Sequence, residues 1–315
     1  MLWFIQLSVT LFILVVFAIV MILILFWMTF RSSKRRQNDA RTIPNDDAYL
    51  PYMPEILKRV DSLSSIPCEP VTLQSRDGLQ LSGRYYHHRD GAPLALCFHG
   101  YRSVSIRDFC GGFSIAASAG HNVLLVDQRA HGNSEGHVIT FGIRERLDCL
   151  DWIHYAVKRF GAEIPIYLYG VSMGAATVLM ASGLTLPASV RGIIADCPYS
   201  APEAIIAKVV RDRHLPVRLT MPLIRFAARL PGGFRLDEAS PLEAVRHTPV
   251  PILILHGEND LFVPCSMSQS IRDANPSMIR LHTFPGADHA ISYFVNMNRY
   301  TALVQQFLTD TLPAS

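Results

Sequence analysis

The chain has 315 residues, of which half are hydrophobic, a formal net charge of +3 at pH 7, and six cysteines. This length is typical of one large domain or two small ones. So small a net charge excludes the strongly basic surface of most nucleic-acid-binding proteins. The cysteines are scattered without a C-x-x-C pair, which excludes the common zinc spacings and favours free thiols in a reducing compartment. We therefore expect no nucleic-acid partner, no metal and no cofactor.

Much of the hydrophobicity lies at the N-terminus, where residues 2–30 carry no charge. About 20 apolar residues suffice to cross a bilayer as a helix. Trp3 and Trp27 lie near the two ends, where aromatic rings favour the membrane interface. The alternative is a cleaved signal peptide, but the stretch has no basic start and no small-x-small cleavage site. Residues 1–30 are therefore predicted to be a transmembrane anchor in contact with membrane lipid.

Positive charge follows the anchor immediately. The basic residues are Arg31, Lys34, Arg35, Arg36 and Arg41. Because positively charged flanks stay on the cytoplasmic side, we expect a single-pass protein of the cell membrane with a cytoplasmic catalytic domain. The alternative topology is an extracytoplasmic domain on an uncleaved signal anchor. Residues 31–66 are interpreted as a basic flank and linker, with a short helix between Tyr49 and Val60.

From residue 67 onward, short apolar strands alternate with helices. The first two strands, Val71–Ser75 and Leu79–His87, flank a D-G turn and predict a hairpin. The later strands are expected at 93–98, 122–126, 164–169, 191–195, 251–256 and 278–284, and helices at 106–119, 142–160, 175–181 and 301–312. This alternation predicts a mainly parallel sheet with helices on both faces, in one domain over residues 67–315.

One segment interrupts the alternation. About 55 residues separate the strands at 191–195 and 251–256, which is too long for a structureless loop. We interpret residues 200–247 as a small helical cap insertion. Its apolar residues, Met221, Leu223, Ile224, Phe226 and Ala227, are consistent either with packing on the core or with contact to an acyl group of a substrate.

The strongest motif is G-x-S-x-G at Gly170–Gly174. An apolar strand precedes it and an Ala-, Leu- and Met-rich helix follows. A serine on such a turn is exposed at the end of the sheet, and the following helix aims free N–H groups at any oxyanion beside it. Ser172 is therefore the candidate nucleophile.

A nucleophilic serine needs a base, and the base needs an orienting acid. Two later strands end in the loops His256–Asp260 and Pro285–His289. Parallel strands place such loops along one edge of the sheet. We assign Asp260 as the acid and His289 as the general base. Other candidates for the acid are Glu258, Asp288 and Asp196.

The oxyanion hole requires two N–H donors. The backbone N–H of Met173, directly after the nucleophile, is the first candidate, and that of Tyr101, after the strand at 93–98, is the second. His99, in the same loop, is expected to brace the loop by hydrogen bonds rather than to act in catalysis.

Taken together, His99-Gly100, Asp127–Ser134, Gly170–Gly174, His256–Asp260 and Gly286–His289 resemble the α/β-hydrolase superfamily. The resemblance covers roughly residues 68–313. More narrowly, the chain resembles the bacterial membrane-anchored serine hydrolases related to the Bem46-like and S33-peptidase-like groups. It implies the α/β-hydrolase fold, the triad and oxyanion roles given above, and a structural role for the turn at 127–134. Ala130 departs from the family, which often has glycine there.

The sequence thus predicts a membrane-anchored serine hydrolase that cleaves a carboxylic ester or thioester through an acyl-enzyme. The first alternative is a serine peptidase of aminopeptidase type, for which Glu203 or Glu243 could hold the substrate amine. The second is a non-catalytic binding protein on the same fold. The sequence predicts no oligomeric state.

Overall fold

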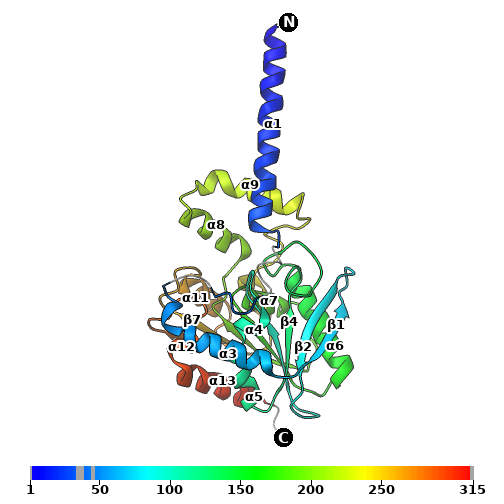
Figure 1. Cartoon of the computed structure of the whole chain (residues 1–315), viewed down its shortest axis with the longest axis vertical. Coiled ribbons are helices and arrows are strands. Elements are labelled where there is room, and N and C mark those ends of the chain that lie inside the picture. The colour runs from blue at the N-terminus through cyan, green and yellow to red at the C-terminus, as the bar shows by residue number, and fades with distance from the viewer. Residues whose placement is uncertain (1, 33–38, 44–46, 313–315) are drawn as a thin grey trace.

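The computed structural model describes residues 2–32, 39–43 and 47–312. Its centre is an eight-stranded sheet in the order β1-β2-β4-β3-β5-β6-β7-β8 (Figure 1). The strands are β1 Glu69–Gln74, β2 Gln80–Tyr86, β3 Leu94–Phe98, β4 Asn122–Asp127, β5 Ile166–Val171, β6 Val190–Asp196, β7 Ile252–Gly257 and β8 Ile279–Phe284. The inner strands are buried from end to end because helices cover both faces.

The pairing confirms the predicted mainly parallel sheet. β1 and β2 form the antiparallel hairpin, and β2 joins β4 antiparallel. Every pair from β4 to β8 is parallel. The chain order reverses between β3 and β5, and ligands of open parallel sheets bind beside the carboxyl ends of the strands at such a point.

Helices pack on the two faces of the sheet. One face carries α3 Met53–Ser65, α4 Ser105–Asp108, α5 Gly112–Ser118, α12 Ser292–Val295 and α13 Met297–Thr311. The other carries α6 Glu145–Phe160, α7 Met173–Ala181, α10 Pro241–Ala244 with the short helix η2 Val245–His247, and α11 Cys265–Ala274. Each layer fills one hydrophobic core.

The single helix predicted over residues 106–119 is wrong in one respect, because the structure divides it into α4 and α5. The break lies at Phe109–Gly111. A Cβ on Gly111 would lie 2.4 Å from the ring of Tyr293, so the chain passes too close to α12 for any other residue. The break thus lies where the chain packs closely against a distant segment.

The segment interpreted as a linker is partly folded. Leu50–Tyr52 form the 3-10 helix η1, and α3 follows it directly. Ile56, Val60 and Leu63 of α3 are buried in the core. The folded domain therefore begins well before residue 67. Lys34, Arg35 and Arg36 of the predicted basic flank lie outside the described residues.

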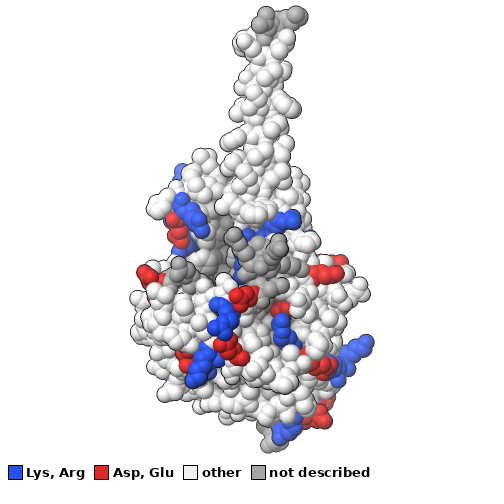
Figure 2. Space-filling model, in the orientation of Figure 1, with Lys and Arg blue, Asp and Glu red and all other residues white. Residues whose placement is uncertain are grey.

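The N-terminal helix α1 (Leu2–Thr29) projects from the domain and is long and apolar enough to cross a membrane by length and composition (Figure 1). Figure 2 shows it as a column without charged side chains. Its last turns pack against the cap helix α9 (Val217–Arg229), which in turn packs against α8 (Pro202–Asp212), in a third hydrophobic cluster. Phe30, just after α1, is fully buried there, against Phe141 and Phe234.

Candidate active site

Ser172 lies on a strained turn between β5 and α7. Its φ of 54° and ψ of −112° fall outside the regions that a serine normally adopts. A Cβ on Gly170 would lie 2.4 Å from the backbone of Gly174, and a Cβ on Gly174 would lie 1.8 Å from the carbonyl oxygen of Phe98. Both glycines are therefore required for β3, the turn and α7 to pack together. The turn has the geometry of a nucleophile elbow.

Ser172, His289 and Asp260 are joined by hydrogen bonds. The Ser172 hydroxyl lies 2.9 Å from His289 Nε2, and His289 Nδ1 lies 2.7 Å from Asp260 Oδ2. With Nδ1 protonated toward the carboxylate, Nε2 is free to accept the serine proton. The ring of Phe262 packs edge-on against His289 at 5.1 Å and limits its movement. The arrangement matches that of a nucleophile, a general base and an orienting acid.

The surroundings of Asp260 keep it ionised. Burial by itself raises the pKa of this carboxyl, but hydrogen bonds from His256, His289 and the backbone N–H of Val263 outweigh burial and hold the pKa well below its usual value. Asp260 Oδ1 also accepts from the N–H of Phe262 at 2.9 Å. The carboxylate is therefore fixed in place and charged, as an acid that orients an imidazolium must be.

The other candidates for the acid do not contact His289 Nδ1. Asp288 accepts hydrogen bonds from the N–H groups of Leu261 and His289, and so ties two loops together. Glu258 is exposed and accepts from Thr283 at 2.6 Å. Asp196 is buried and accepts from Tyr300 Oη at 2.9 Å.

The loop after β3 runs directly beside the serine. A Cβ on Gly100 would lie 3.5 Å from Ser172 Cβ. Within the described part of the chain, the N–H groups of Tyr101 and Met173 donate no hydrogen bond, and that of Met173 opens α7, where helical N–H groups lack partners. Both are therefore available to an oxyanion.

His99 braces this loop, as expected. Its Nδ1 donates to the Gly100 carbonyl at 2.8 Å, and its Nε2 accepts from the N–H of Gln128 at 3.1 Å. Burial lowers the pKa of His99, which is consistent with a neutral ring. Within the turn at 127–134, Arg129 forms a buried bidentate ion pair with Asp148, so the turn has a structural role.

The same loop binds the end of α1. Tyr101 Oη donates to the Thr29 carbonyl at 2.8 Å, and Arg102 Nη2 donates to the carbonyls of Met28 and Arg31 at 2.8 and 3.0 Å. The Tyr101 ring also stacks on Phe141. The anchor and the candidate oxyanion loop are thus one connected structure. No sequence motif pointed to this link, because Tyr101 and Arg102 lie about 70 residues from their partners.

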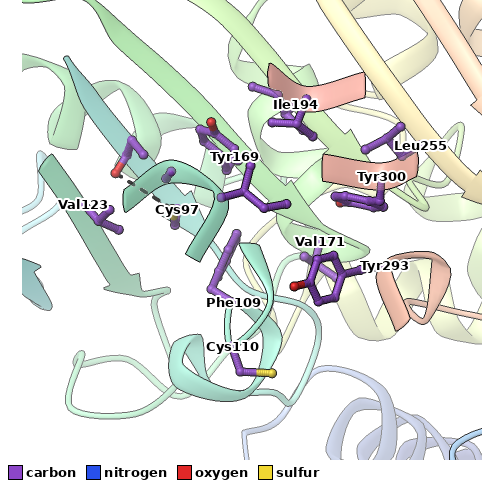
Figure 3. Packing of buried hydrophobic residues seen from close by; sticks show 14 of the residues in the cluster. Cys97, Phe109, Cys110, Val123, Tyr169, Val171, Ile194, Leu255, Tyr293 and Tyr300 are labelled. Atoms are coloured by element: carbon purple, nitrogen blue, oxygen red, sulfur yellow. Dashed lines mark hydrogen bonds between the residues drawn. The ribbon is translucent and has the colours of Figure 1, made fainter. Parts of the chain in front are cut away.

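A cavity of about 190 Å³ opens beside Ser172 and extends under the candidate oxyanion loop. Its walls are mainly apolar, with a few polar groups near Ser172 and Asp196. Figure 3 shows Tyr169 of β5, Phe109, Tyr293 of α12 and Tyr300 of α13 lying around this part of the core. Such a lining suits an acyl or alkyl group of modest size.

The segment before α3, and not the cap, contributes to the cavity. Ile43 and Tyr49 line it together with Ile56 of α3, and Tyr49 Oη donates to the His289 carbonyl at 2.8 Å. Among the described residues of the lining, none comes from 200–247. Of the two interpretations of the cap, the structure therefore supports packing, because Met221, Ile224 and Ala227 are buried against α1 and the core, although Phe226 of the same predicted set is exposed. Sequence reasoning missed Ile43 and Tyr49, whose pattern gave no sign of a site.

Comparison with known proteins agrees with this fold. The family described as alpha/beta hydrolase fold matches residues 93–219. The chain thus has the α/β-hydrolase fold and resembles the α/β-hydrolase superfamily. An uncharacterized protein of Bacillus subtilis, YqkD, is 27% identical over 251 residues, which cover 79% of this chain and 82% of YqkD.

One further relative and one similar structure have stated activities. The lysophosphatidylserine lipase ABHD12 of Danio rerio is 28% identical over 191 residues, 58% of this chain but only 47% of the lipase. Among solved structures, the Pyrococcus furiosus esterase Pf2001 superimposes with a TM-score of 0.63 at 21% identity, over 80% of this chain and 96% of the esterase. The structural likeness establishes the fold, which hosts many chemistries.

Proposed function

We propose that this protein is a membrane-anchored serine hydrolase that cleaves a carboxylic ester or thioester. The observation that carries the proposal is the hydrogen-bonded chain from Ser172 through His289 to Asp260, on a strained turn beside an apolar cavity. Lipase and esterase relatives support an ester substrate.

The reaction proceeds in two halves. Ser172 Oγ attacks the acyl carbonyl while its proton passes to His289 Nε2, and the N–H groups of Tyr101 and Met173 stabilise the oxyanion. The bond from the acyl carbon to oxygen or sulfur breaks, and His289 protonates the leaving alcohol or thiol. A water molecule, deprotonated by His289, then attacks the acyl-enzyme and releases the acid. Each oxyanion donor contributes about 3 kcal/mol in enzymes of this kind.

The contacts of the two glutamates argue against an aminopeptidase. Such an enzyme needs a carboxylate beside the scissile bond to hold the substrate amine. Glu203 is paired with Arg225, and Glu243 is paired with Arg246; neither lines the cavity. The ester and thioester chemistry is therefore favoured.

We propose that α1 anchors the protein in the cell membrane as a single pass, with the domain on the cytoplasmic side. The supporting observation is the uncharged surface of α1 followed by Arg31 and Arg41. Digestion of the domain by protease added to intact cells would overturn the topology and favour the extracytoplasmic alternative.

The test of the chemistry is a hydrolysis assay with detergent-solubilised full-length protein. p-Nitrophenyl esters and acyl thioesters of increasing chain length are compared with aminoacyl p-nitroanilides. We expect turnover of esters or thioesters, lost in Ser172→Ala and retained in Ser270→Ala, a control serine on the exposed side of α11. Preference for the anilides would favour the peptidase, and no turnover of any of them would favour the binding protein.

A further inference from the structure

The cap helix α9 exposes an apolar stripe to solvent. Leu219 and Leu230 are 71% and 64% exposed, and Leu215, Pro222 and Phe226 are exposed with them. Leu219, Pro222, Phe226 and Leu230 are spaced three or four apart, so they follow one side of α9, and Leu215 lies two residues before the helix begins. An exposed row of large side chains on a folded domain marks a surface that contacts something else.

The opposite side of α9 is the side that packs on the protein. Met221, Ile224 and Ala228 are buried in the cluster that holds the end of α1. Successive residues turn by about 100° around the axis, which places the exposed stripe nearly opposite this buried side. No element among the described residues covers the stripe.

Arginines flank the stripe. Arg218, Arg225 and Arg229 follow the helical spacing of one further row, between the buried and the exposed sides. Only Arg225 among them has an ion-pair partner in the described structure, Glu203. Residues 213–233 contain four arginines and no acidic residue. An apolar side bordered by arginines is the pattern of a helix that lies in the surface of an anionic membrane.

The length of α1 places α9 at that surface. Its 28 residues span about 42 Å at about 1.5 Å per residue, whereas the bilayer core is about 30 Å thick. The last eight residues or so therefore project beyond the core. The part of α1 that contacts the cap, through Ile22, Leu25 and Phe26, is in this region. Figure 1 shows α8 and α9 at the end of the domain from which α1 leaves.

We infer that α9 lies in the interface of the bilayer that α1 spans, with its stripe of Leu215, Leu219, Pro222, Phe226 and Leu230 among the lipid chains and its arginines among anionic headgroups. This inference rests on the anchoring part of the proposed function. Two elements, the spanning helix α1 and the interfacial helix α9, then hold the protein to the membrane. Two attachments fix the orientation of the catalytic domain, whereas α1 alone would leave the domain free to turn.

The fixed orientation brings the candidate active site toward the lipid. Lys208 of α8 donates to the carbonyl of Leu261, which is exposed and follows Asp260 directly. The neighbouring Phe262 is also exposed and lines the cavity beside His289. Leu261 and Phe262 thus form an apolar rim on the cap side of the domain. An ester that resides in the bilayer can therefore enter the cavity without crossing water.

The test measures the depth of α9 in vesicles with the full-length chain. Trp3→Phe and Trp27→Phe leave Trp152, which is fully buried in α6, as an internal reference. Leu219→Trp adds a reporter on the stripe. Leu312→Trp, at an exposed leucine beyond α13, is the matched control at the far end of the domain. Each protein is reconstituted into phosphatidylcholine–phosphatidylglycerol vesicles with plain or brominated acyl chains.

We expect bromine to quench the reporter of Leu219→Trp by roughly twofold and to leave the Leu312→Trp control and Trp152 unchanged. If Leu219→Trp has the same fluorescence in plain and in brominated vesicles, as the Leu312→Trp control does, the inference is wrong. The stripe would then be a binding surface for a protein partner. Flotation of the vesicles separates the insertion of α9 from the anchoring by α1. Protein that floats with the vesicles but is not quenched contradicts only the insertion of α9. Protein that does not float contradicts the anchoring as well.

A double variant tests the same inference by measuring catalysis. Leu219→Asp combined with Phe226→Asp should reduce cleavage of a long-chain ester embedded in vesicles by roughly tenfold, because each charge opposes insertion. Cleavage of a water-soluble short-chain ester should not change, which also shows that the variant is folded. Equal activity on the embedded ester before and after the substitutions would contradict the inference.

Discussion

Phe30 gives the sharpest test of the docking between the anchor and the domain. Its side chain is fully buried, with edge-to-face contacts to Phe234 at 5.3 Å and Phe141 at 5.9 Å between ring centres. Truncating a buried phenylalanine costs about 3–5 kcal/mol, from lost burial and the cavity that remains. The free energy of unfolding of Phe30→Ala should therefore be lower than that of the wild type by this amount.

The assay is thermal unfolding of detergent-solubilised protein followed by near-ultraviolet circular dichroism. In a domain of this size, 1 kcal/mol shifts the Tm by roughly 2–4 °C, so a loss of about 3–5 kcal/mol in Phe30→Ala should lower the Tm by roughly 6–20 °C. Phe12→Ala removes the same side chain from an exposed position of α1 and serves as the control. Equal Tm values for the two variants would refute the docking of Phe30 in the domain.

Three further predictions concern the site. Gly174→Ala places a methyl group 1.8 Å from the Phe98 carbonyl and should yield no folded protein on gel filtration, whereas Gly112→Ala, with 3.4 Å to its nearest neighbour, should fold. Burial raises the pKa of Asp196 from 3.8 to about 6, although its hydrogen bond from Tyr300 opposes the rise. The folded state thus binds this proton more tightly than the unfolded chain, and the stability it contributes, up to about 3 kcal/mol, is complete below about pH 4 and lost as the pH rises through 6. In chemical denaturation, Asp196→Asn should therefore gain stability relative to the wild type as the pH rises from about 4 to about 6. A difference that stays constant over this range would contradict the raised pKa of Asp196. Asp260→Asn should lower kcat by about 10⁴ because the imidazole loses its orienting charge, and a loss below tenfold would place the acid elsewhere.

Local patterns account for most of what the sequence predicted. The alternation of strands and helices, the glycines around Ser172, and the loops that carry Asp260 and His289 are features of short segments. The parallel sheet then brings these loops to one edge, since the carboxyl ends of parallel strands lie together. The structure places the side chains of Ser172 and Asp260 within hydrogen-bonding distance of His289, one on each side of its ring.

Contacts between distant segments account for what the sequence did not predict. The break between α4 and α5 lies where Gly111 packs against Tyr293, and the bonds from Tyr101 and Arg102 to α1 join segments far apart in the chain. Tyr49 reaches the site across 240 residues. Such contacts leave no periodic signal, so a proline-containing segment with a short helix is indistinguishable from a linker until its partners are known.

Mapping the site of reaction with a fluorophosphonate probe tests the central claim most directly. A probe of this class phosphonylates a serine that a neighbouring base activates. Peptide mass spectrometry of the labelled full-length protein should place the adduct on Ser172, and labelling should disappear in Ser172→Ala and fall sharply in His289→Ala. An adduct on another serine, or labelling that persists in Ser172→Ala, would contradict the assignment of Ser172 as the nucleophile.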